Sequence, residues 1–136
     1  KISPLYNSLL EKGLINNRFG TEHFYGNSYA AILFDGESKD PDAVKDSIIS
    51  EIKRIAENGV EPSLFDDAKR KLYGHSIRGY NDPEEAVGEF IDCYIDGTEP
   101  YSDLLALKEI TADDVTAFAR SLNLENVAIS VILPQM

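Results

Sequence analysis

Two histidines and one cysteine are the side chains of this sequence best suited to bind a metal or attack a substrate. His23 and His75 lie far apart, and neither has a second histidine four residues away, the spacing that places two zinc ligands on one helix face. A zinc site that joins them through the fold with a glutamate stays open. The simpler interpretation puts His23 on a strand face and His75 on a helix surface, so we assign no metal ligand.

The other candidates for nucleophilic chemistry lack the partners that such chemistry needs. Cys93 lies among apolar residues of a predicted helix without a nearby histidine, so we expect a buried, unreactive thiol. No serine stands in a Gly-x-Ser-x-Gly context, and the glycines form no phosphate-binding loop. Acid pairs such as Asp113-Asp114 fall in the first turns of predicted helices, where the helix dipole favours them. The residues alone therefore predict no catalytic, cofactor-binding or metal-binding residue.

Composition excludes several classes of partner. The 136 residues carry a formal net charge of -11, which disfavours nucleic acids and anionic membranes. No stretch approaches the roughly 18 consecutive apolar residues that a membrane span needs. The single cysteine cannot form an internal disulfide, which favours a reducing compartment and hence the cytoplasm. The basic run 69–71 is most simply a solvated helix face, with a substrate-contacting patch as the alternative.

A strand pair followed by a long helix organises the chain. Residues 19–25 and 28–35 have the aromatic and β-branched content of strands, and Gly26-Asn27 supplies the turn between them. Asp40-Pro41 then opens a helix whose apolar residues recur at helical spacing until Asn58-Gly59 ends it. We expect its apolar stripe to lie against the strands.

Further helices and one more strand complete the prediction. Helices are expected after Pro62, Pro83, Pro100 and Thr111, burying side chains such as Leu72 and Phe118. The β-branched run 126–133, which Pro134 ends, is expected to form a third, central strand. The predicted fold class is α+β with two layers: an antiparallel sheet of strands near 19–25, 28–35 and 126–133, covered on one face by several helices. Residues 1–136 are expected to form a single domain, as a piece of a longer chain.

A series of motifs resembles the insulinase/pitrilysin-type zinc peptidases, which have the inverted zinc motif. The series keeps the family's order along nearly the entire chain: Ser3-Pro4-Leu5-Tyr6, Gly13-Leu14-Ile15, the strand pair, the helix at Pro41, Ala68-Lys69-Arg70, the helix from Asn81 to Tyr94 with Tyr101 beyond it, Leu107-x-x-Ile110-Thr111 leading to Val115, and a last strand ending at Pro134. The chain looks most like the C-terminal, inactive-domain half of the bacterial members.

The resemblance implies that the zinc site lies elsewhere. Family enzymes pair two halves of related α+β fold around a chamber, and the catalytic half carries His-x-x-Glu-His, which this sequence lacks. In many members the second half contributes an arginine and a tyrosine that steady the substrate carbonyl. Here no arginine stands between Phe19 and Lys39, and Tyr29 alone does not satisfy that pattern. The implied partners are a catalytic peptidase domain or subunit and a peptide substrate.

Three hypotheses follow from these observations. The first is a non-catalytic domain of a zinc metallopeptidase that helps to enclose and hold peptide. The second is a non-proteolytic structural or assembly subunit that shares the fold, and the third an unrelated α+β ligand-binding domain. Because the chain is expected to begin inside the family's domain, its sheet would have an open edge, and a homodimer of the fragment is a further possible assembly.

Overall fold

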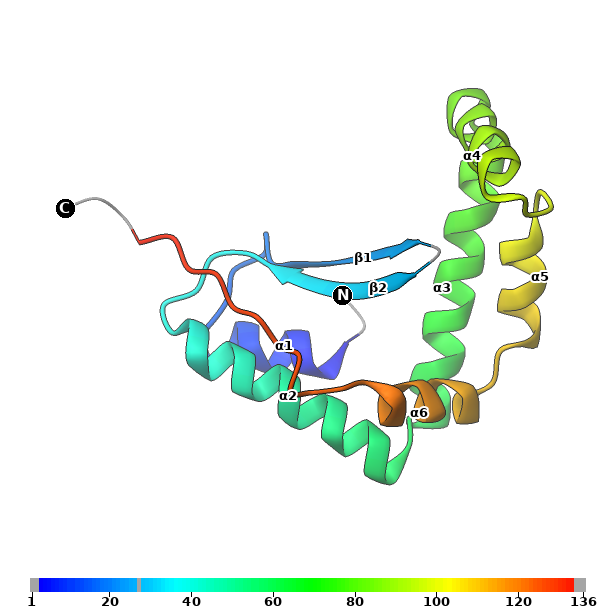
Figure 1. Cartoon of the computed structure of the whole chain (residues 1–136). Helices are drawn as coiled ribbons and strands as arrows, with labels where there is room; N and C mark the ends of the chain where they lie inside the picture. Colours follow the sequence, from blue (N-terminus) through cyan, green and yellow to red (C-terminus); the bar gives the residue numbers. More distant parts are fainter. Residues whose placement is uncertain (1–2, 27, 134–136) are drawn as a thin grey trace. The chain divides into compact units, whose positions relative to one another are not determined.

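The computed structural model describes residues 3–26 and 28–133, which contain six α-helices and two β-strands (Figure 1). In chain order these are α1 (Pro4–Glu11), β1 (Gly20–Gly26), β2 (Tyr29–Asp35), α2 (Pro41–Asn58), α3 (Pro62–Asn81), α4 (Pro83–Asp96), α5 (Ser102–Glu109) and α6 (Ala112–Ser121). The chain divides into two compact units: a sheet unit, residues 1–54 with 121–136, and a helical unit, residues 55–120. The expectation of a single domain stays a prediction.

The sheet unit begins with a capped helix. Ser3 Oγ accepts a hydrogen bond from the backbone N–H of Tyr6 at 3.4 Å, and Pro4 occupies the first helical position, where no N–H is needed. The helix ends before Gly13, whose φ of 65° lies in the left-handed region that glycine adopts without a Cβ clash. Ile15 then forms an isolated antiparallel bridge with Ser38, which ties the two ends of the hairpin segment together.

The predicted strand pair is confirmed. β1 and β2 pair antiparallel from Gly20 opposite Asp35 to Gly26 opposite Tyr29. This register leaves residues 27 and 28 between the strands, so the connection lies one residue later than the predicted Gly26-Asn27 turn, although Asn27 itself lies outside the described residues. Within the described residues these two strands make up the whole sheet.

α2 follows its predicted boundaries closely. Asp40 Oδ1 accepts a hydrogen bond from the N–H of Ala43 at 3.0 Å, and Gly59 adopts a φ of 79° just beyond the last turn. Val44 and Ile48 are buried one helical turn apart, so the apolar stripe of α2 faces inward as expected.

Five apolar side chains form the core of the sheet unit. They are Leu9, Ile15, Phe19, Val44 and Ile48, and Phe34 and Ile52 pack against them. Because Phe34 stands near the end of β2, the helices cover the sheet at that end. The α+β class is thus confirmed, with α1 and α2 as the covering helices of this unit.

The prediction of a third strand at residues 126–133 is wrong. This described segment forms no ladder with β1 or β2, and Ile132 is 95% exposed. β-branched residues favour an extended backbone, but a strand also needs a neighbour for its N–H and C=O groups. The end that we expected at Pro134 lies outside the described residues.

The helical unit is built from helices with local caps. Glu61 accepts hydrogen bonds from the N–H groups of Ser63 and Leu64 at the start of α3. At the start of α4, Asp82 accepts hydrogen bonds from the N–H groups of Glu84 and Glu85. α4 ends at Gly97, which has a φ of 70°. The starts of α3 at Pro62 and of α4 at Pro83 confirm the helices predicted there.

Burial in this unit differs from expectation. α3 has no fully buried residue and Leu72 is more than half exposed; Phe118 on α6 is also about half exposed. The buried residues among those described in this unit are Cys93, Thr116 and Ala119. Helical spacing showed that an apolar stripe exists, but the neighbouring helices contact only parts of each stripe.

Candidate functional site

The β1–β2 hairpin presents side chains on two distinct faces. Successive residues of a strand point to opposite sides, so the register sorts them. The inner face, defined as the side that carries Phe34, holds Thr21, His23, Tyr25, Ala30, Ile32 and Phe34; the outer face holds Glu22, Phe24, Tyr29, Ala31 and Leu33. The rings of His23 and Tyr25 stack with centroids 6.0 Å apart, as expected for neighbours on one face.

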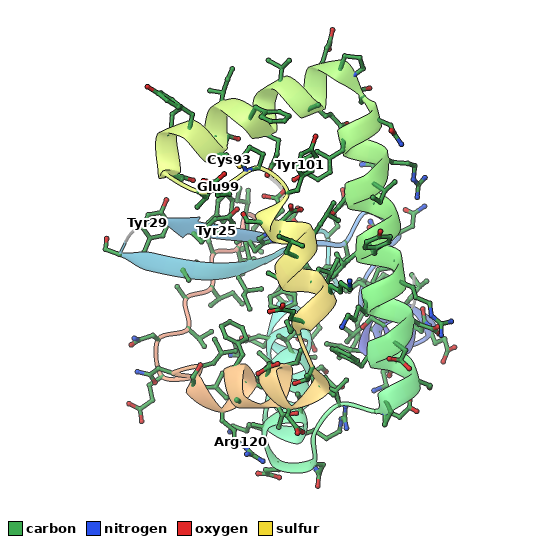
Figure 2. The ribbon with its side chains drawn as sticks, turned by 90° about the vertical axis from the view of Figure 1, so that its right-hand side faces the viewer. Tyr25, Tyr29, Cys93, Glu99, Tyr101 and Arg120 are labelled. Atoms are coloured by element: carbon green, nitrogen blue, oxygen red, sulfur yellow. The ribbon has the colours of Figure 1, made fainter. Side chains whose placement is uncertain are left out.

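Both faces expose large apolar groups. Tyr25 is 73% exposed and Tyr29 is 62% exposed, and Figure 2 shows both at the hairpin end of the strands. Phe24 and Leu33 on the outer face and Ile32 on the inner face are each exposed by two-fifths to one-half. A two-stranded ribbon with apolar groups on both faces is marginally stable alone, so this surface is suited to cover by another protein segment.

The edges of this sheet are also open within the described residues. Each strand bonds to the other along one side, so the opposite side presents a row of N–H and C=O groups. Such an edge accepts an extended peptide as an added strand, with side-chain pockets on alternate positions. The hairpin thus has the two features of a strand-addition site: free main-chain groups and apolar side chains beside them.

The C-terminal segment of the sheet unit adds further exposed apolar groups. Val127, Ile129 and Val131 are spaced two residues apart and are each about half exposed. A spacing of two residues is the side-chain period of a strand, but this segment forms no strand among the described residues.

A polar cluster lies in the helical unit. The Tyr80 hydroxyl on α3 donates a hydrogen bond to Asp103 Oδ1 on α5 at 2.7 Å and lies 3.5 Å from Glu89 Oε1 on α4. A small open cavity of about 200 Å³ adjoins these groups and is also lined by His75 and Glu85. The three helices therefore meet at one phenol.

The environment of Tyr80 keeps its hydroxyl protonated. Burial, the hydrogen bond to Asp103, and the negative charges of Asp103 and Glu89 all raise the pKa of Tyr80. A phenol with a raised pKa donates hydrogen bonds and does not serve as a base near neutral pH. The phenol therefore links α3 to α5 through its hydrogen bond and is not itself a base near neutral pH.

Aromatic contacts complete this cluster. Tyr101 contacts the ring of Tyr80 with centroids 4.5 Å apart, and it meets the ring of Phe90 in a T-shaped arrangement with centroids 5.8 Å apart. Its φ of 66° is unusual for a residue with a Cβ, and Tyr101 stands at the N-cap of α5, directly before Ser102. Figure 2 shows Tyr101 together with Cys93 and Glu99 where α4 leads into α5.

The side chains first considered for metal chemistry lie on different elements. His23 stacks on Tyr25 of the sheet unit, whereas His75 is exposed on α3 of the helical unit. Cys93 is buried, as predicted, with Glu89 Oε1 at 3.8 Å from its sulfur. In the described ranges no group of three or more His, Cys, Asp or Glu side chains is placed to hold a metal ion. These residues do not fit the tetrahedral set that zinc requires.

Comparison with known families decides the origin of the fold. The model of the Peptidase M16 inactive domain matches residues 1–72, which is more than half of the chain. The chain belongs to this family. The match confirms the resemblance to the insulinase/pitrilysin-type peptidases, and it covers α1, the hairpin and α2.

Two bacterial relatives support the M16 assignment. The chain is 29% identical over 117 residues to the protein named "Uncharacterized zinc protease YmfH" of Bacillus subtilis, covering 85% of the chain and 27% of that protein. The crystal structure of a protein described as an M16-like peptidase, from Alicyclobacillus acidocaldarius, has the same fold with a TM-score of 0.80 at 24% identity. This structural match covers 87% of the present chain and 29% of the Alicyclobacillus protein. The present chain therefore spans less than a third of the length of either relative.

The M16 domain has one feature that sequence reasoning missed. Tyr80 and Asp103 are separated by 23 residues, and nothing in their local context pairs them. An aromatic residue close to an acidic one, Tyr101 and Asp103, is a local sign of this cluster. Only the packing of α5 on α3 brings the Tyr80 hydroxyl to Asp103. The described helices also include none that is long and apolar enough to span a bilayer.

Proposed function

We propose that this chain is a non-catalytic domain of an M16 zinc metallopeptidase that helps to enclose and hold peptide substrate. The match to the Peptidase M16 inactive domain carries this proposal. The catalytic zinc would be bound by His-x-x-Glu-His in another domain or chain, because this sequence has no such motif. The catalytic half is then the domain's main partner. The single cysteine supports a reducing location such as the cytoplasm.

The hairpin supplies the means of holding a peptide. A strand added to its open edge would bond through the peptide backbone, which every substrate shares. Leu33, Phe24 and Tyr29 on the outer face would contact alternate side chains of the added strand. This arrangement selects extended peptides by shape and imposes a weak choice of sequence.

The test uses the full-length parent protein and its peptide cleavage. We expect Leu33→Lys to raise KM about tenfold, equivalent to about 1.4 kcal/mol of lost binding, with kcat little changed. Leu105→Lys on α5 is the matched control, since it places the same charge on another exposed leucine. A substrate N-methylated at alternate non-scissile positions separates backbone pairing from side-chain contact, because N-methylation removes strand hydrogen bonds.

Two outcomes contradict the proposal in different ways. Equal KM values for Leu33→Lys and Leu105→Lys, with no effect of N-methylation, would remove the hairpin as the holding site. Absence of His-x-x-Glu-His from both the parent protein and its partner chain, with no cleavage, would favour the structural or assembly subunit instead. Association of two copies through the hairpin, seen by sedimentation and abolished by Leu33→Lys, would indicate a homodimer.

A further inference from the structure

α4 carries apolar side chains on two sides, and only one side packs within the helical unit. Cys93 is buried and Phe90 contacts the ring of Tyr101, so these residues form the inward row. Glu89, on the same side, approaches the hydroxyl of Tyr80. These contacts account for the attachment of α4 to α3 and α5.

The opposite side of α4 is an exposed apolar stripe formed by Val87, Ile91, Tyr94 and Ile95. These four side chains are between 53% and 89% exposed. Their spacing of four, seven and eight residues places them along one face of the helix. A contiguous apolar stripe on a helix surface typically marks an interaction site, whereas a face that stays in contact with water normally carries only scattered single apolar residues.

The stretch of sequence that contains this stripe carries charge of one sign. From Gly79 to Leu107 the sequence contains no lysine or arginine. The same stretch contains eight acidic residues: Asp82, Glu84, Glu85, Glu89, Asp92, Asp96, Glu99 and Asp103. By helical spacing, Glu85, Asp92 and Asp96 line one side of the stripe and are exposed. The stripe is therefore an apolar surface beside a row of negative charge.

This combination restricts what can cover the stripe. Phosphates of a nucleic acid or an anionic membrane would be repelled by the acidic row. A second copy of α4 packed antiparallel on the stripe would bring two acidic rows together, and in any packing each copy carries a net charge of -11, which is also unfavourable. A segment with an apolar face bordered by lysine or arginine matches both the stripe and the row.

We propose that the exposed stripe of α4 docks a cationic amphipathic helix of a protein partner. The partner's apolar side chains would cover Val87, Ile91 and Ile95, while its lysines or arginines would face Asp92 and Asp96. The stripe lies on a different element from the hairpin edge, so a test of this docking site does not depend on whether the hairpin holds peptide.

The test measures binding of two designed helical peptides to the 136-residue chain by fluorescence anisotropy. Both have 18 residues and the same leucine face, and the polar face carries lysine in one and glutamate in the other. We expect the lysine peptide to bind at least tenfold more tightly, with an affinity that falls as salt is raised. Ile91→Asp should weaken its binding tenfold or more, since it places an uncompensated carboxylate in the apolar contact.

Matched variants separate docking on α4 from general attraction to an acidic protein. Leu105→Asp changes an exposed leucine of the same unit, and we expect it to leave binding within twofold of the unchanged chain. Asp92→Lys with Asp96→Lys should weaken the lysine peptide about tenfold, whereas Asp66→Lys with Asp67→Lys, the same charge change on α3, should have a much smaller effect. Circular dichroism of each variant verifies that the helices are retained.

Several results would overturn the proposal. One is equal binding of the lysine and glutamate peptides, and another is absence of binding by both. Equal weakening by the α3 and α4 charge pairs would show that only net charge matters. Self-association of the chain that Ile91→Asp abolishes would assign the stripe to a second copy.

Discussion

The sheet unit and the helical unit are stabilised by different interactions. In the sheet unit, five apolar side chains are buried together, and Leu9 at the centre is only 1% exposed. In the helical unit, Cys93, Thr116 and Ala119 are the buried residues among those described, and contacts distant in sequence include hydrogen bonds such as that from Tyr80 to Asp103. One unit thus relies on water exclusion and the other depends more on polar contacts and caps.

This difference predicts unequal sensitivity to mutation. Removing a buried apolar group loses both transfer free energy and packing, because the cavity closes only in part. Removing an exposed hydrogen bond costs less, because water replaces the lost partner. The variants below test this contrast in order of decreasing expected effect.

The largest effect is expected for Leu9→Ala in the sheet unit. Truncating this buried side chain should lower the free energy of unfolding by about 2–5 kcal/mol, measured by urea denaturation. Leu10→Ala on the same helix is the control, because Leu10 is 40% exposed and should cost less than about 1 kcal/mol. Similar losses for both variants would show that Leu9 is not part of a tightly packed core.

A smaller effect is expected for Tyr80→Phe in the helical unit. The change removes the hydrogen bond to Asp103 but keeps the ring that contacts Tyr101, so we expect a loss of about 1 kcal/mol. Asp103→Asn and the double variant complete a cycle that isolates the pair. Tyr73→Phe on α3 is the control for the loss of a more exposed hydroxyl. A coupling energy of zero would show that the hydrogen bond between Tyr80 and Asp103 does not stabilise this unit.

Lys69→Met tests a second link between the same helices. Lys69 Nζ donates to the backbone carbonyls of Lys108 and Ile110 at 2.9 and 2.7 Å, where α5 ends. Methionine keeps most of the aliphatic chain and removes the charge, so we expect a loss of about 0.5–1 kcal/mol and faster amide exchange in α5. Lys71→Met should leave both measurements unchanged. The same exchange rates in α5 for both variants would contradict this role.

The smallest effect concerns the cap of α6 and depends on pH. Thr111 donates hydrogen bonds from its hydroxyl and backbone N–H to the Asp114 carboxylate, which lowers the pKa of Asp114 below its usual 3.8. A lowered folded-state pKa means that this stabilisation is present above pH 3.8 and is lost as the pH falls through the lower value.

Thermal melting at several pH values measures this cap. Asp114→Asn should lower the Tm by a few degrees at most at pH 7 and have no effect once the carboxylate is protonated. Asp113→Asn removes a charge from the same helical turn without touching the bonds to Thr111, so its effect should be smaller. A Tm difference between Asp114→Asn and the unchanged chain that persists at acidic pH would contradict the assignment.

Local signals in the sequence predicted the elements well. Asp40 and Asp82 accept hydrogen bonds from N–H groups two or three residues ahead, and Gly59 and Gly97 adopt positive φ just beyond their helices. These interactions involve near neighbours in the chain, so composition and order are enough to reveal them. The hairpin was predictable for the same reason.

Pairings between distant residues were not predictable in this way. The Tyr80–Asp103 hydrogen bond spans 23 residues and has no local signature. Helical periodicity identified the apolar stripes of α3 and α4, but it could not show that Leu72 and Ile91 would be exposed. Which stripe is covered depends on the neighbours that tertiary packing provides.

The sequence alone therefore determined the helices, the hairpin, the M16 resemblance and the absence of the inverted zinc motif, because each depends on residues close together in the chain. Tertiary structure alone decided that residues 126–133 remain unpaired in the described chain and that one side of α4 stays open. The physical reason is the same in both cases. A β-branched run or an apolar stripe in the sequence shows which side chains could be buried. Only neighbouring elements in the folded structure determine whether those side chains are buried.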